Sequence, residues 1–177
     1  MDSIIEANPI TREFFEAQAH LYKHIFSHIN GMVLKCAIQL NIPDIIHNHG
    51  QPITIPQLIS KLEIHPTKTA CVERLVRFLV HNGFLSKTKV NDEEDEEGEN
   101  EAFVLTPSST LLVKGLEPNL IPMVLATFHT DVIASLDLLG KWFKGKEKTV
   151  SESAFGLGIW DLLESERLKM KGWLAIR

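Results

Sequence analysis

The stretch Cys71-Val-Glu-Arg-Leu-Val-Arg-Phe-Leu-Val-His-Asn-Gly-Phe-Leu85 decides the fold of this chain. Its apolar residues recur every three or four positions, which places them on one face of a helix. Asn82 and Gly83 close that helix, because asparagine or glycine is typical just after the last periodic residue. An apolar-faced helix with two arginines that leads into a strand has the form of a DNA-recognition helix. What such a helix recognises depends on the charges around it.

The segments beside this helix complete a winged helix-turn-helix order. Residues 53–62 predict a short helix with Thr54 as its N-cap, and His65-Pro-Thr67 predicts the turn before the quoted helix. Residues 84–90 and 102–106 have the composition of two strands joined by a loop. We therefore predict a mainly α fold, a winged helix-turn-helix with a two-stranded wing followed by further helices.

Helical apolar spacing also extends to both ends of this core. Residues 11–40 predict helix, and we expect Gly31 to divide it into two. A mostly apolar helical segment is expected over 118–143, interrupted or entered at Pro122, and a turn-rich link over 151–158. The apolar stripes on the first predicted helix and on residues 118–143 exceed what one small winged helix can cover. That excess predicts association with a partner.

The charge balance argues against nucleic acid. Lysine and arginine number 18 against 23 aspartate and glutamate, a net charge of -5, whereas phosphate-binding domains are usually basic. The expected wing tip, residues 92–101, carries eight carboxylates that would repel a polyanion. Arg74 and Arg77, with Lys87 and Lys89, are too few to outweigh them. DNA binding is therefore the less favoured interpretation, and the acidic run is expected to be a solvated loop.

Cysteines and histidines are the candidates for metal or redox chemistry. Cys36 and Cys71 lie in apolar helical patterns and form no CxxC pair, so we expect buried thiols in a reducing compartment. His20, His24 and His28 recur every four residues and share one helical edge, as a pair of zinc ligands would. A single exposed edge does not enclose an ion. We expect surface or interface histidines and no metal.

No catalytic constellation is readable from spacing alone. Gly156-Leu-Gly158 comes nearest to a phosphate-binding loop, but no strand precedes it and no third glycine follows. His129-Thr-Asp131 interrupts an apolar helix and leaves two interpretations open, a satisfied cap or buried group and the polar lining of a ligand cavity. No secretory signal and no membrane-spanning run is visible, so a cytoplasmic protein that binds no membrane is expected.

Four ordered blocks carry a family likeness: Leu21-Tyr-Lys-His-Ile-Phe26, Leu40-Asn-Ile-Pro-Asp-Ile-Ile-His-Asn-His-Gly50, Arg74-Leu-Val-Arg-Phe-Leu-Val-His-Asn-Gly-Phe84 and Leu105-Thr-Pro-Ser-Ser-Thr-Leu-Leu112. Together they resemble the N-terminal region of plant small-molecule O-methyltransferases, with the isoflavone and flavonoid branch nearest. The resemblance implies a winged-helix domain that mediates a homodimer and does not read DNA. In that family it precedes a Rossmann-like domain that binds S-adenosylmethionine and methylates a phenolic hydroxyl.

The resemblance divides the chain into three parts. Residues 1–113 would be the winged-helix dimerisation domain, and 114–164 a helical segment that helps to wall the substrate pocket. Residues 165–177 depart from the family pattern, which predicts a truncated family member without the methyltransferase domain. Such a fragment could also act as a regulator by forming defective heterodimers with full-length subunits.

The resemblance further implies roles for five residues. Phe128 and His129 would line the substrate pocket, as would Phe155 and Trp160, while Met32 would cross the dimer into the partner's pocket. The family's donor loop, ribose-binding acid and base histidine fall beyond these blocks. Methyl transfer depends on donor and base being held in line with the phenol. We therefore expect no catalytic residue here, no binding of S-adenosylmethionine, and inactivity of the chain alone.

Overall fold

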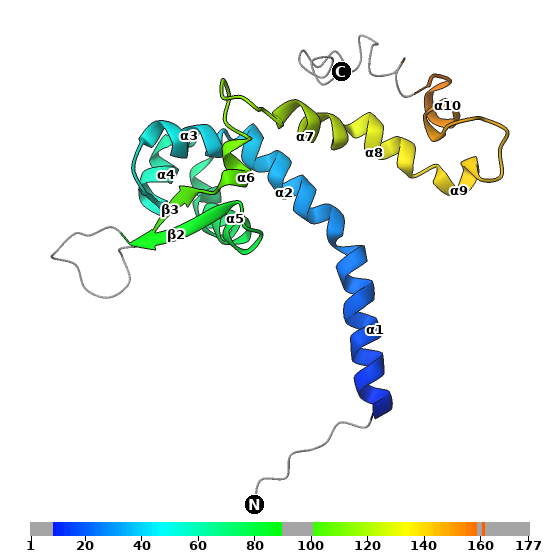
Figure 1. Ribbon diagram of the computed structural model, residues 1–177, viewed down its shortest axis with the longest axis horizontal. Coiled ribbons are helices and arrows are strands. Elements are labelled where there is room, and N and C mark those ends of the chain that lie inside the picture. The colour runs from blue at the N-terminus through cyan, green and yellow to red at the C-terminus, as the bar shows by residue number, and fades with distance from the viewer. Residues whose placement is uncertain (1–8, 90–100, 159–160, 162–177) are drawn as a thin grey trace, which may run out of the picture.

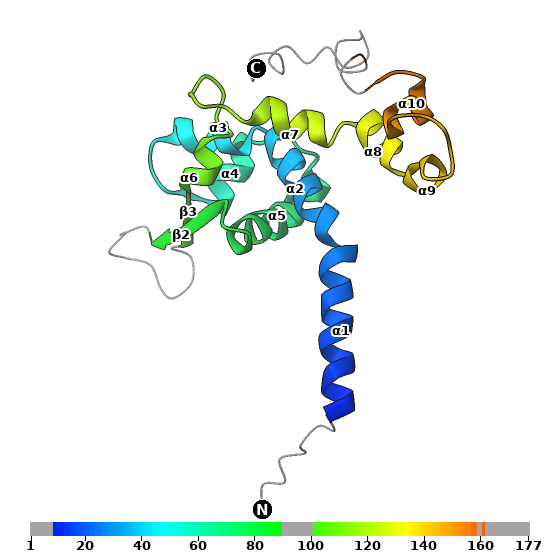
Figure 2. The same cartoon turned by 45° about the vertical axis from the view of Figure 1, so that its right-hand side comes forward.

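The computed structural model describes residues 9–89, 101–158 and 161, and Figure 1 shows their arrangement. The helices are α1 (Pro9–Ile25), α2 (Ser27–Gln39), α3 (Ile42–His49), α4 (Ile55–Lys61), the 3-10 turn η1 (Pro66–Lys68), α5 (Thr69–His81), α6 (Pro107–Thr110), α7 (Ile121–Thr127), α8 (Thr130–Leu136), α9 (Leu139–Trp142) and α10 (Val150–Phe155). The strands are β1 (Ile53–Thr54), β2 (Leu85–Lys89) and β3 (Glu101–Leu105). Helices α2 to α6 and the strands form the body of the molecule, from which α1 and the α7–α10 arm extend separately (Figures 1 and 2).

The two expected strands are present as β2 and β3, and a third strand that was not expected, β1, pairs with β3, which gives an antiparallel sheet in the order β1-β3-β2. Ile53 pairs with Phe103 of β3, and both side chains are buried. A strand of two residues gives no alternating pattern, which is why the sequence did not reveal it. Thr54 then caps α4: its hydroxyl accepts a hydrogen bond from the N–H of Gln57 at 3.4 Å, and the Gln57 side chain accepts from the Thr54 N–H.

The core lies where α3, α4 and α5 pack together with the sheet. The predicted apolar face of α5 is confirmed, because Val72, Val76 and Leu79 are all buried. The largest fully buried side chains of the chain are Phe103, Ile42, Ile53, Leu58 and Val76. Most of them come from elements before and after α5, so the other elements of the body pack against the helix quoted above.

The N-terminal helices divide at Phe26, not at Gly31 as expected. The Ser27 hydroxyl donates to the carbonyl of His24 at 2.8 Å at this break. Gly31 lies inside α2, whose C-terminal half is anchored in the body by the buried Ala37 and Ile38. Beyond the break α1 runs clear of the body in both views (Figures 1 and 2), and its described side chains, from Thr11 on, are exposed.

The helical segment expected over 118–143 consists of three short helices, α7, α8 and α9. The break between α7 and α8 comes where Phe128 ends one helix and His129 caps the next. The expected turn-rich link over 151–158 also differs, because α10 occupies most of it and packs against α8. Within the described residues, no helix combines the length and apolarity that crossing a membrane requires.

Candidate functional site

Two of the predicted pocket residues form the junction between α7 and α8, which we call the elbow (Phe128–His129). The N–H of Phe128 donates to the carbonyl of Val124 at 3.1 Å and ends α7. His129 caps α8: its Nδ1 accepts from the N–H of Asp131 at 3.3 Å and lies 3.9 Å from the Asp131 carboxylate. The cap interpretation of His129 is therefore confirmed. One-third of its side chain (33%) stays exposed, so a role as pocket lining remains a prediction.

The elbow packs against one face of α2. A Cβ added to Gly31 would lie 1.8 Å from Cζ of Phe128, so the aromatic ring rests directly on the glycine backbone. One helical turn later the ammonium of Lys35 donates to the carbonyl of Phe128 at 2.6 Å. Met32 follows Gly31 and is 44% exposed. Phe128 thus meets α2 at one crossing, His129 is the next residue of the elbow, and Met32 lies on α2 next to Gly31.

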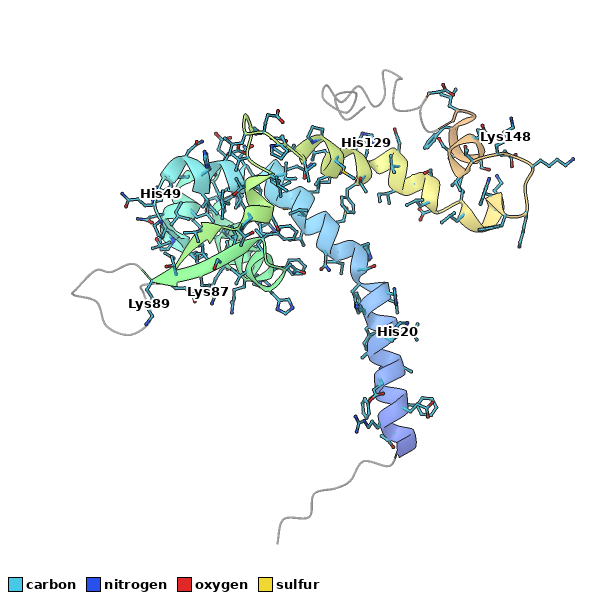
Figure 3. The ribbon with its side chains drawn as sticks, in the orientation of Figure 1. His20, His49, Lys87, Lys89, His129 and Lys148 are labelled. Carbon is cyan, nitrogen blue, oxygen red and sulfur yellow. The ribbon has the colours of Figure 1, made fainter. Side chains whose placement is uncertain are left out.

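The other two predicted residues lie further along the chain. Phe155 is the last residue of α10, is half-buried, and is linked to the elbow through α8, against which α10 packs. Trp160 lies outside the described residues, as does the tail over 165–177. Figure 3 places His129 between α7 and α8, well away from Lys87 and Lys89 at the sheet.

Large apolar side chains are exposed on both extensions of the body. On α1 and the start of α2 they are Phe14, Phe15, Leu21, Tyr22, Ile25, Phe26, Ile29 and Met32. On the α7–α9 segment they are Leu120, Met123, Ile133, Leu136, Leu139 and Phe143. Scattered exposed apolar residues are ordinary on protein surfaces, but contiguous sets of this size mark interaction surfaces. The predicted excess of apolar surface is present in the structure.

Three of the basic residues that a DNA-reading surface would use contact other groups within the chain. Arg77 pairs with Glu73 one turn earlier at 3.0 Å, and the Arg74 guanidinium donates to Sγ of Cys71 at 3.4 Å. Lys87 of β2 pairs with Glu101 of β3 at 2.5 Å. The wing tip lies outside the described residues apart from that glutamate. These contacts lower the charge that α5 and the sheet could offer to a phosphate.

The thiols and histidines differ in part from expectation. Cys71 is exposed, so the prediction of a buried thiol is wrong there, because the residue lies on the solvent side of α5; Cys36 is half-buried. His20 and His24 stack edge to face with their ring centroids 4.7 Å apart on the exposed α1. Across residues 9–89, 101–158 and 161, no three or more histidine, cysteine or acidic side chains gather in a way that could hold a metal ion.

The Gly156-Leu-Gly158 segment ends a helix. Gly156 has φ +70°, the left-handed conformation typical of a helix C-cap, and its N–H donates to the carbonyl of Glu152 at 2.9 Å. A phosphate-binding glycine loop instead follows a strand and opens a helix. All three strands of the described residues belong to the antiparallel sheet. This segment therefore lacks the geometry of a nucleotide loop.

In the loop between α9 and α10, hydrogen bonds lower the pKa of Glu147 from its ordinary value of 4.5. The largest contribution is the backbone N–H of Glu147 itself; partial desolvation acts in the opposite direction, and the N–H of Lys146 and the hydroxyl of Ser153 add to the lowering. The indole N–H of Trp142 donates to the Glu147 carbonyl at 2.8 Å. The ionised carboxylate thus organises this loop at neutral pH.

Sequence reasoning missed Gly31 and Lys35 as contacts of the elbow. The available signal was the glycine itself, because an isolated glycine inside a helical pattern often has a packing reason. Nothing in the sequence connects Lys35 with a carbonyl 93 residues away. An apolar recess in the body shares no lining residue with the predicted set and has room for about one water molecule.

Comparison with known proteins identifies a family and relatives of similar sequence. The family model of the O-methyltransferase dimerisation domain matches residues 22–115. The isoflavone 4'-O-methyltransferase of Glycyrrhiza echinata is 45% identical over 158 residues, which are 87% of this chain and 43% of that protein. The trans-resveratrol di-O-methyltransferase of Vitis vinifera is 44% identical over 86% of this chain and 42% of its own length. The chain thus spans less than half the length of these relatives.

Solved structures agree at the level of the fold. Human N-acetylserotonin methyltransferase in complex with SAM matches with a TM-score of 0.64 at 14% identity, over 93% of this chain and 43% of that protein. The pyocyanin biosynthetic protein PhzM matches with a TM-score of 0.60 at 20% identity, over 85% of this chain and 40% of that protein. Both matches again cover less than half of the larger protein.

Proposed function

The chain belongs to the O-methyltransferase dimerisation-domain family, and from this premise we propose that it joins two subunits and supplies part of the wall of a substrate pocket. The observation that carries the proposal is the exposed apolar surface of α1. The helix runs clear of the body with aromatic and aliphatic side chains exposed along its length. Large apolar side chains on a helix without a packing partner in its own chain favour burial against a second polypeptide.

A second copy of the same chain is the partner that this surface favours. Symmetric pairing is the commonest solution for soluble assemblies, because one patch then meets its own equivalent. The exposed faces of α1 and of the α7–α9 segment give each copy two apolar surfaces to bury. A full-length methyltransferase subunit would present the same surfaces, so the chain could also form mixed dimers and lower the activity of the subunit that it captures.

The body of such a dimer is, in our proposal, a winged helix that has no role in reading DNA. The order α3, α4, α5, β2, β3 supports the winged helix, with β1 as an additional strand. The net charge of -5 and the ion pair of Arg77 with Glu73 favour protein over DNA as the partner. We assign residues 1–113 to dimerisation, 114–164 to the pocket wall, and leave 165–177 as a tail without a role.

The proposed substrate is a phenolic compound of the isoflavone or flavonoid kind. The names of the relatives support this class, since they are an isoflavone and a resveratrol methyltransferase. Phe128 and His129 would contact the ring, Phe155 and Trp160 would extend the wall, and Met32 would enter from the partner. A wall of aromatic side chains with one polar group is the usual composition of such a pocket.

We assign no binding site for the methyl donor, S-adenosylmethionine, among the described residues. The glycine pair near α10 closes a helix, as its positive φ at Gly156 requires, and so cannot cradle the donor as a helix-opening loop would. We therefore assign no donor-binding, base or other catalytic residue within the described part of the chain. The contribution of the chain to methylation is to bring subunits together and to shape one side of the pocket.

Sedimentation of the purified chain tests the proposal. We expect a dimer at micromolar concentration that dissociates on dilution, and a monomer at every concentration would refute the dimerisation role. Adding excess chain to the Glycyrrhiza echinata isoflavone 4'-O-methyltransferase tests the mixed dimer separately. Lower turnover is expected, whereas unchanged turnover would remove the regulatory alternative and leave self-association standing.

A further inference from the structure

We propose that Gly31 and Lys35 form a two-point seat on α2 that fixes the elbow, and that these two residues thereby position the pocket-wall residues Phe128 and His129. The role of the elbow as a pocket wall rests on the proposed function. The seat itself is a packing arrangement that can be tested without substrate.

The first point is the contact between Gly31 and the ring of Phe128. The position of a Cβ at residue 31 falls 1.8 Å from Cζ, 2.3 Å from Cε1 and 2.6 Å from Cε2 of the ring. Distances this short do not occur between real atoms, so every residue other than glycine would push the ring away. The three nearest atoms form the outer edge of the ring. The glycine therefore sets how closely α7 and α8 approach α2.

The second point is the hydrogen bond from Lys35 to the carbonyl of Phe128. The lysine is half-buried, and its ammonium lies 2.6 Å from an oxygen at the C-terminal end of α7. A positive charge is favourable there, because the last carbonyls of a helix lack partners within the helix and carry its negative pole. The ring contact sets the distance between the helices, and this bond sets where α7 ends along α2.

The two seat residues are four positions apart, so they share one face of α2. Met32 follows Gly31 and points about 100° away around the helix axis. Helix α2 therefore holds the elbow of its own subunit on one face. On another face it presents Met32, the residue proposed to reach into the partner's pocket. A displacement of α2 on dimer formation would move the elbow with it.

Hydrogen–deuterium exchange of the full chain tests the seat. The variants are Gly31→Ala, Lys35→Met and the double variant Gly31→Ala with Phe128→Leu. Leucine lacks the three ring atoms that the new methyl group would meet. Gly140→Ala is the matched control, because Gly140 is also helical but nothing lies within 4 Å of its added Cβ.

We expect Gly31→Ala and Lys35→Met to accelerate exchange over 121–136 by about tenfold, with the amides of α5 unaffected. Gly140→Ala should leave α7 and α8 unchanged, and the Phe128→Leu exchange should restore protection to the Gly31→Ala chain. Equal behaviour of Gly31→Ala and Gly140→Ala would overturn the inference, as would faster exchange spread evenly over the whole chain. Failure of the double variant to restore protection would also count against it. Sedimentation of the unaltered chain reports on self-association independently, so the two proposals can fail separately.

Discussion

Replacement of Phe15 by alanine should weaken self-association of the chain. Phe15 lies on α1 and is 65% exposed in the single chain. A phenylalanine offers about 200 Å² of surface, so about 130 Å² of Phe15 is available to a partner. If half of that area is buried in a symmetric dimer, the two copies together lose about 3 kcal/mol at about 25 cal/mol per Å². That loss corresponds to an increase of about 100-fold in the dissociation constant.

Sedimentation equilibrium over a concentration series measures this constant directly. His24→Ala is the matched control, because His24 lies nine positions, or about two and a half helical turns, from Phe15 and so faces the other way on the same exposed helix. We expect the control to change the dissociation constant by less than about twofold. Circular dichroism of each variant checks that α1 is still helical. Equal effects of the two substitutions, or no effect of Phe15→Ala, would refute the assignment of this face of α1 to the dimer.

Four further predictions concern stability, pH and the donor. Gly140→Ala should stabilise the chain by up to about 1 kcal/mol in urea unfolding, as alanine usually does in a helix, whereas Gly31→Ala should destabilise it by about 1–3 kcal/mol through overpacking; the same sign for both would contradict the seat. Thr106→Ala should cost about 1 kcal/mol, because its hydroxyl donates to the carbonyls of Gly83 and Phe84 in the turn after α5, and an unchanged midpoint would contradict that contribution. Because the pKa of Glu147 is lowered, its contribution to the loop is present above the unfolded value of 4.5 and is lost as the pH falls through the lower folded value; the fluorescence of Trp142 should follow that loss, and Glu147→Gln should remove it. Titration calorimetry of the chain with S-adenosylmethionine should give no binding heat, and a saturable heat would show that the donor site lies within these residues.

The body of the fold was predictable because its signals are local. The apolar spacing of Val72, Val76 and Leu79 is visible in the sequence, and all three are buried. The threonine and proline at the start of α4 also match the observed cap. The strand at residues 53–54 was missed because two residues cannot show a period, and only its pairing with β3 defines it.

The break at Phe26 was not predictable from the sequence, because a stronger helix breaker lies nearby. Gly31 is the weakest helix former in its segment, so intrinsic propensity placed the break there. The structure keeps Gly31 helical because the ring of Phe128, 97 positions later, fills the space that a side chain would occupy. At His129 the sequence did indicate an interruption, with a helix cap as one of two interpretations, and the structure shows that the His129 ring caps α8. The family resemblance indicated the residues of the candidate site. It did not indicate the contact of Gly31 and Lys35 on α2 with Phe128.

The exposure of α1 should make the stability of this helix depend on protein concentration. Its described side chains are all exposed in the subunit, so the apolar residues on α1 gain much of their burial only when a partner covers them. A dimer that buries them gains stability with protein concentration by mass action, so the unfolding temperature of α1 should rise with concentration. The body has its own buried core in Phe103, Ile42 and Val76 and does not share that dependence. Two unfolding transitions are therefore expected on heating, with only the one that reports on α1 moving as the chain is diluted; a single transition at a fixed temperature would mean that α1 packs on its own subunit.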